Sequence, residues 1–412
     1  MRILLLSLQE VQESAPGSGS TQARRIRLEE DQSLAMVEAM RDGGNLAPML
    51  VCLQNSRLHR LAAERNLPLL AVSGGRSLWG MVRLWRWQRR HRSLLVQTVG
   101  EEAMRLGYWV FRMRRPGTTL LAHAFFLRPP AETACCSREM LSASRILYGS
   151  SYVRERLRQA WEGAVCQEEY ARLNAALIAL QPGIDSEGFA PSISFEEGGR
   201  FVFAMNDSLV PRSGAQTVVR AMAALWQRSD LPAWEVRMLG AGPRFQEVLS
   251  EARSLGVASR LCLLHEQSVP QVLSFCHAWL APGSAPDEAP KTLWQGFAAG
   301  LPVICSRSSL HLERLAPHAS SVWPEGPASL VPVNDAQALA RAMIDCMQQA
   351  DLREELIRRS HFVFSQTGWR HMAAQACMLF EDWLQGLETA TPGQQCPASS
   401  ESPLPLTDSH EM

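Results

Sequence analysis

Short apolar runs alternate with longer amphipathic segments along the first half of the chain. Residues 2–7, 49–53 and 69–72 have the length and composition of buried strands. Between such runs, apolar residues recur three or four positions apart, as they do on one face of a helix. Further strands are predicted at 94–98, 119–123 and 146–149, and helices from about 21 and at 57–65, 78–90, 101–113 and 152–159. Repeated units of this length predict a parallel, Rossmann-like α/β sheet.

The same alternation resumes after residue 200. Strands are predicted at 201–205, 236–242, 261–265, 278–282 and 301–305. Helices are predicted at 334–349, 351–364 and 369–387, and after Gly214 with a core stripe of Val218, Val219, Met222, Leu225 and Trp226. A chain of 412 residues with two such series predicts two domains. We place them at 1–178 and 179–366, followed by a last helix at 367–387 and a proline- and serine-rich, disordered tail at 388–412.

The stretch 281–305 contains polar residues at a predicted sheet edge. Pro282 keeps its first part irregular, and Asp287 or Glu288 can cap the helix that follows. Gly300 ends that helix before the next strand. Because parallel sheets bind ligands at their carboxyl edge, the start of this helix is a predicted ligand site.

The same stretch resembles the donor-site motif of GT-B glycosyltransferases, in particular the large retaining family 4. In that family a proline–serine loop precedes two acidic residues that are separated by seven others. Pro282 and Ser284 fit the loop, Asp287 takes the first acidic position, and Gln295 stands where the family has a glutamate. The tail of the motif is matched by Ala298, Ala299, Gly300, Pro302 and Val303.

The resemblance extends over most of the chain, with two weaker matches and one departure from the family pattern. Gly183-Ile184-Asp185 is similar to the family's linker between domains, and 240–243 matches its G-x-G-P turn. Ser208 and Ser213 stand where the family has two cationic residues that neutralise the donor diphosphate, with Arg212 adjacent.

The resemblance implies two Rossmann-like domains that face a central cleft, with the nucleotide-sugar donor held by the second. It assigns Asp287 to the sugar hydroxyls as a catalytic residue and Gln295 to the ribose. Gly242 and His265 would line the nucleotide, and Arg212 would substitute for the missing cations. No cofactor beyond the donor substrate is implied, and no D-x-D metal motif is present.

Lys291 is the single lysine among 41 basic residues, and it lies at a predicted helix start. A positive side chain is unfavourable there because the helix dipole is already positive at that end. The position is reasonable if the free backbone N–H groups of Lys291 and Thr292 hold the diphosphate. We expect Lys291 to supply the charge that is absent at Ser208 and Ser213. The alternative is a lysine that projects into solvent.

Two candidates lie in the first half of the chain. Gly17 and Gly19 follow the first strand, where small residues allow close approach to a phosphate or sugar; a plain flexible turn is the alternative. His123 ends the predicted strand 119–123. The family often has a histidine at such a strand tip near the reacting sugar, which would make His123 catalytic; a purely structural histidine is the alternative.

Charge is unevenly distributed although the net charge is zero. Residues 1–150 contain 21 arginines and 12 acidic residues, a net charge of +9 that the remaining residues balance. The segment 77–92 combines five arginines with three tryptophans, a composition typical of helices that lie on anionic bilayers. The alternative is a domain helix with solvated arginines.

Ten scattered cysteines suit reduced thiols. No signal peptide or membrane span is visible, so a cytoplasmic or peripheral membrane location is expected.

The resemblance implies transfer of a sugar from a nucleotide sugar to an acceptor hydroxyl in glycan, lipopolysaccharide or other cell-surface polysaccharide assembly, with retention and without a metal. The acceptor would be a glycan or a lipid-linked glycan, and nucleic acid is not an expected partner. The competing interpretation is a non-catalytic GT-B protein that binds nucleotide or a partner in a glycan-assembly complex. Ser208, Ser213 and Gln295 favour that interpretation, whereas Asp287 and Lys291 oppose it.

Overall fold

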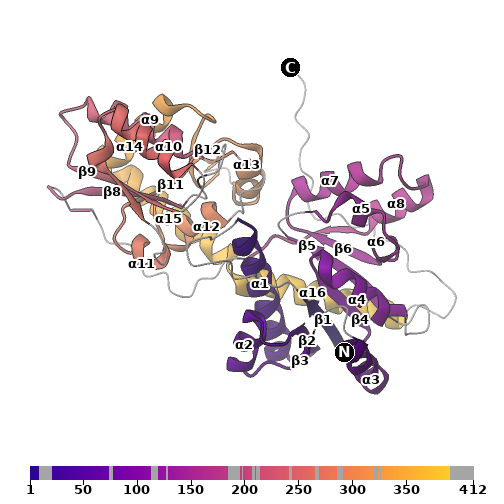
Figure 1. The fold of residues 1–412 in the computed structure, drawn as a ribbon. Coiled ribbons are helices and arrows are strands. Elements are labelled where there is room, and N and C mark those ends of the chain that lie inside the picture. The colour runs from indigo at the N-terminus through magenta and orange to yellow at the C-terminus, as the bar shows by residue number, and fades with distance from the viewer. Residues whose placement is uncertain are drawn as a thin grey trace.

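Two α/β domains lie side by side in the structure, a computed structural model (Figure 1). It describes residues 1–8, 21–73, 78–112, 119–126, 129–183, 195–196, 198–206, 209, 214–240, 244–264, 269–284, 291–319, 323–324 and 326–389. Each domain is built around one sheet whose strand pairs are all parallel in the described residues. The predicted fold class is therefore confirmed.

The first sheet has the strand order β3-β2-β1-β4-β5-β6-β7 within the described part of the chain. Its strands are β1 (Arg2–Ser7), β2 (Ala47–Leu53), β3 (Leu69–Val72), β4 (Leu95–Val99), β5 (Leu120–Phe125), β6 (Arg145–Tyr148) and β7 (Leu177–Ala179). Its helices are α1 (Thr21–Gly43), α2 (Arg57–Glu64), α3 (Leu78–His91), α4 (Glu101–Arg112), α5 (Glu132–Cys135), α6 (Arg138–Leu141), α7 (Ser151–Trp161) and α8 (Gln167–Ala175). The order reverses between β1 and β4, which makes their carboxyl ends the switch point of this sheet.

The second sheet repeats this arrangement with the described order β10-β9-β8-β11-β12-β13. Its strands are β8 (Phe201–Asn206), β9 (Trp234–Leu239), β10 (Leu261–Leu264), β11 (Ala278–Ala281), β12 (Val303–Ser306) and β13 (Ser329–Val331). Its helices are α9 (Ala215–Trp226), α10 (Phe245–Ser254), α11 (Val269–Leu273), α12 (Lys291–Ala298), α13 (Ser309–Leu315), α14 (Ala336–Gln348) and α15 (Ala350–Thr367), with two short 3-10 turns at Ala258–Arg260 and Ala316–His318. Here the switch point lies between β8 and β11.

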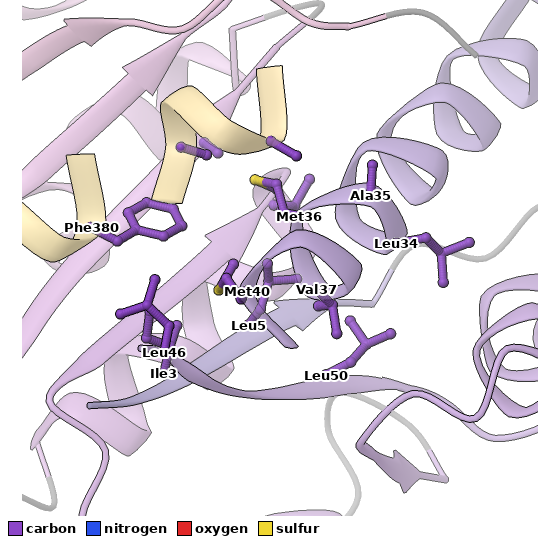
Figure 2. Packing of buried hydrophobic residues seen from close by; sticks show 14 of the residues in the cluster. Ile3, Leu5, Leu34, Ala35, Met36, Val37, Met40, Leu46, Leu50 and Phe380 are labelled. Atoms are coloured by element: carbon purple, nitrogen blue, oxygen red, sulfur yellow. The ribbon is translucent and has the colours of Figure 1, made fainter. Parts of the chain in front are cut away.

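The last helix, α16 (Trp369–Thr389), leaves the second domain and packs into the core of the first. Its apolar side chains share one cluster with β1, β2 and α1, and Figure 2 shows Phe380 among Ile3, Leu46 and Met36. The connection between domains is fixed at the same place, because Gln32 of α1 exchanges two hydrogen bonds with the backbone of Gly183. A β-carbon at Gly183 would lie 2.8 Å from the Cα of Trp369, so the chain passes close to the start of α16.

Two predictions about local structure are wrong. β5 continues to Phe125, so His123 lies inside the strand and not at its tip. Trp226 is 49% exposed at the end of α9, where Arg260 lies 5.4 Å from its ring, although the rest of the predicted core stripe is buried. α8 and β7 belong to the first domain, and β7 ends at Ala179, next to the predicted boundary at 178.

Candidate functional site

The switch point of the second sheet brings together segments from three places in the sequence. Asn206 ends β8, residues 282–284 follow β11, and α12 lies directly beyond them. Ligands of open parallel sheets bind at this position because strand carboxyl ends and helix amino ends meet there. The predicted site on the stretch 281–305 thus lies where the topology favours a ligand.

Asn206 and Gln295 form a polar pair at this edge. The Asn206 Nδ2 group donates to the Gln295 Oε1 atom at 3.0 Å, and the Gln295 side chain is buried. Because its oxygen accepts from Asn206, the amide nitrogen of Gln295 is the group that remains for a ligand hydroxyl. The residue at the second acidic position is therefore held in a fixed orientation by the neighbouring strand.

Close contact with β11 fixes the position of α12. The Trp279 indole N–H donates to the Thr292 carbonyl at 2.6 Å. A β-carbon at Gly296 would lie 2.4 Å from the Trp279 ring, so only glycine permits this approach. Leu293 and Phe297 are fully buried on the same helix. The first turn of α12, with Lys291 and Thr292, is consequently fixed against the sheet.

The segment 282–284 is enclosed from two sides. Gly214 precedes α9 with φ +94°, and a β-carbon there would lie 2.7 Å from the Pro282 carbonyl carbon. From the other side, the Ser306 hydroxyl donates to the Gly283 carbonyl at 2.5 Å. The chain that leads to Asp287 thus starts from a rigid position.

The predicted site residues are only partly within the described chain. Gln295, Thr292 and Lys291 all lie on α12, although the Lys291 side chain is not described. Predictions for Gly17, Gly19, Arg212, Gly242, His265 and Asp287, and for Ser208 and Ser213, lie outside the described residues. The roles of all these residues stay predictions.

His123 lies in the other domain and is fully buried. Its Nε2 atom is 3.0 Å from the Glu139 carbonyl, an acceptor, so Nε2 carries the proton. Nδ1 then accepts from the Thr98 hydroxyl at 2.6 Å. Burial lowers the pKa of His123 to about 4, so the ring is neutral at pH 7. Both ring nitrogens are bonded within the first domain, and a catalytic role for His123 stays a prediction.

Some residues of this edge were not predicted from the sequence. Asn206 is the polar last residue of an otherwise buried strand, a pattern that could have revealed it. Ser306 has the same position at the end of β12, but its partner Gly283 is 23 residues away. No group of three histidine, cysteine, aspartate or glutamate side chains that could hold a metal ion occurs in the described ranges. The nine cysteines within those ranges are all unpaired.

Sequence comparison relates the second domain to a known family. Residues 189–361 match the family described as glycosyl transferases group 1. A segment of 127 residues is 29% identical to the GDP-mannose-dependent alpha-(1-6)-phosphatidylinositol monomannoside mannosyltransferase of Mycolicibacterium smegmatis. That segment makes up 29% of this chain and spans only 30% of the mannosyltransferase.

Structural comparison covers both domains. A glycosyltransferase from Rickettsia africae superimposes with a TM-score of 0.68 at 14% identity, covering 93% of this chain and 98% of that one. Anabaena HepE in complex with UDP superimposes with a TM-score of 0.67 at 15% identity, covering 93% and 100%. The chain therefore has the GT-B fold, and residues 189–361 of its second domain are similar to the group 1 glycosyl transferases.

Proposed function

We propose that the protein transfers a sugar from a nucleotide sugar to a hydroxyl group of a glycan or lipid-linked acceptor, with retention and without a metal ion. The observation that carries the proposal is the polar edge at the β8/β11 switch point, where Asn206 orients Gln295 beside the first turn of α12. The match to group 1 glycosyltransferases covers this edge, and HepE, which has the same fold, was solved with UDP. The donor would occupy this edge.

The proposed chemistry needs positive charge at one end of the donor. As the bond between sugar and diphosphate breaks, negative charge accumulates on the departing phosphate and must be stabilised. The N–H groups in the first turn of α12 have no partner within the helix, and the helix dipole is positive there. Lys291 opens that turn, and we assign it, together with Arg212, to the diphosphate. Asp287 would accept hydrogen bonds from the sugar hydroxyls.

Nucleotide binding tests the donor assignment. We expect UDP, GDP or another nucleoside diphosphate to raise the melting temperature of the wild type, because a ligand of the native state stabilises it by mass action. Gln295→Ala should weaken binding of that nucleotide by about 1–2 kcal/mol, the cost of losing a buried hydrogen bond. Isothermal titration calorimetry would measure the change.

Two variants control for disturbed folding. Gln295→Glu keeps an acceptor for Asn206 and should retain most of the affinity, whereas Gln246→Ala changes an exposed glutamine on α10 and should have no effect. An unchanged dissociation constant for Gln295→Ala would remove Gln295 from the site. Nucleotide binding without turnover of any nucleotide sugar would favour the non-catalytic alternative, for which an amide at the second acidic position is the motivating observation.

The basic surface of the first domain supports a proposal about location. Arg83, Arg86, Arg89 and Arg90 of α3 are exposed, while Leu84 is fully buried. Trp85 is 39% exposed, with the Arg89 guanidinium 4.8 Å from its ring centre. No helix in the described residues is long and apolar enough to cross a bilayer. We therefore propose that α3 docks peripherally on an anionic membrane surface.

Vesicle flotation tests this docking. Each arginine at an anionic surface contributes about 1 kcal/mol, so changing Arg86, Arg89 and Arg90 to glutamine should weaken binding about a hundredfold at low salt. Arg83 is left intact because its guanidinium also donates to the Ala71 carbonyl. The matched control changes Arg253, Arg341 and Arg370, exposed arginines on α10, α14 and α16. Wild-type protein that fails to float with phosphatidylglycerol vesicles would overturn the proposal.

A further inference from the structure

A direct contact joins the two domains at α13 and α7. The backbone N–H of Ser151 donates to the Glu313 Oε1 atom at 2.5 Å, and the Ser151 hydroxyl donates to Oε2 at 2.6 Å. Ser151 opens α7 in the first domain, and Glu313 belongs to α13, the helix of the second domain that lies towards α7 in Figure 1. A carboxylate with both oxygens bonded at a helix amino terminus is a strong arrangement, because the hydrogen bonds are charge-assisted and the helix dipole is positive there.

The same helix is tied to the segment 282–284, which we call the donor segment because it leads to the proposed donor site. His311, two residues before Glu313, is buried, and its Nδ1 group lies 2.9 Å from the Ser306 carbonyl and 3.1 Å from the Ser306 hydroxyl oxygen. Since the carbonyl only accepts, Nδ1 carries the proton, and the Ser306 hydroxyl is free to donate to the Gly283 carbonyl. A continuous chain of bonds thus runs from Ser151 through α13 to the segment that leads to Asp287.

The charge of Glu313 has a second effect inside the second domain. Arg314 is fully buried, and its Nε and Nη1 atoms have no hydrogen-bond partner in the described chain. Burial lowers the pKa of Arg314 to about 10, while the neighbouring Glu313 charge acts in the opposite direction. Removing the Glu313 carboxylate would therefore leave a buried cation uncompensated. The contact must therefore be tested by substituting Ser151 and not Glu313.

We propose that Glu313 is a positioning residue that docks α7 on α13 and thereby sets the donor segment relative to the first domain. The contact between the two domains does not depend on the proposed function. Its effect on turnover rests on the proposed glycosyl transfer, because donor and acceptor would be bound by different domains. Holding them at a fixed distance converts their encounter into an intramolecular event.

Ser151→Pro should break the contact with Glu313 and leave α7 folded. Proline removes both donors to Glu313, yet it is favoured at the first position of a helix. Ser150 before it has φ −159° and ψ 157°, an extended conformation that a following proline accepts. Gln167→Pro is the matched control, because Gln167 is the exposed first residue of α8 and follows Cys166 with φ −69° and ψ 161°.

Solution scattering and hydrogen exchange on the full chain give readouts that need no substrate. We expect Ser151→Pro to increase the radius of gyration and to speed amide exchange in both α13 and residues 279–284, with Gln167→Pro matching the wild type. Where a transferase assay exists, turnover should fall at least about tenfold while nucleotide affinity changes less than about threefold, since only domain placement is lost. Scattering and exchange curves equal to those of Gln167→Pro would overturn the proposal. An inactive wild type would contradict only the proposed function.

Discussion

The two sheets have the same strand order about their switch points, but they use polar residues differently there. In the second domain, Asn206, Gln295 and Ser306 lie at the carboxyl edge, where Asn206 orients Gln295 of α12 and Ser306 holds the segment 282–284. In the first domain, Thr98 and His123 lie on neighbouring strands and bond to each other inside the domain. The comparison shows that topology selects where a ligand can bind, and that local hydrogen bonds decide which side chains are available to it.

Substitution of His123 has the largest expected effect on stability. It tests whether the polar residues of the first domain are bonded only within that domain. Its pKa is lowered by burial from about 6.5 to about 4, so the unfolded chain binds more protons between these values. The contribution of the neutral ring to stability is complete above pH 6.5 and is lost as the pH falls towards 4. We expect this loss to reach about 3 kcal/mol in the free energy of unfolding.

His123→Gln removes the titration but keeps a donor for the Glu139 carbonyl and an acceptor for Thr98. Urea unfolding of both proteins from pH 7 to pH 4 measures the difference. Burial also lowers the pKa of His277, His311 and His318, but these residues are common to both proteins and cancel. Equal pH dependence in the two proteins would contradict the buried position, and a variant that folds normally but loses turnover would restore the catalytic interpretation.

Apolar periodicity predicted most strands and helices because the central strands, such as β4 and β12, are buried on both faces and each long helix has one apolar side. It did not predict β7 or β13, since three residues are too few to show a period. Trp226 was wrongly predicted to be buried for a different reason. A tryptophan at a helix end can stack on a surface arginine as well as on a core.

The candidate site was predicted unevenly for a different reason. Gln295 was named from a contiguous motif and Thr292 from its place at a predicted helix start, and the roles of both stay predictions. Asn206 could have been named from its strand. The contact between Ser151 and Glu313 joins residues 162 positions apart on different domains. Neither residue has a local pattern that indicates a partner, so only the folded arrangement reveals the pair.

Substitution of Gly214 has a smaller expected effect on stability. It tests how firmly the second domain holds the segment 282–284 at its carboxyl edge. Gly214→Ala must place a β-carbon 2.7–2.8 Å from backbone atoms of Pro282 and Gly283, at a backbone φ of +94°. Gly163 in the first domain has φ +75° and nothing within 4 Å, so Gly163→Ala has the same conformational cost without the contact. We expect Gly163→Ala to destabilise the protein by about 1 kcal/mol and Gly214→Ala by about 2 kcal/mol.

Thermal unfolding of both variants, with nucleotide titration by calorimetry, separates the two contributions. The extra loss in Gly214→Ala measures how tightly α9 approaches the donor segment, because the two substitutions share their backbone strain. Since Pro282 and Gly283 must shift to admit the methyl group, nucleotide affinity should fall about tenfold, or about 1.4 kcal/mol, in Gly214→Ala and stay unchanged in Gly163→Ala. Equal losses of stability in the two variants would show that the segment 282–284 can move away without cost. In that case the second domain would hold its donor edge no more rigidly than an open surface turn.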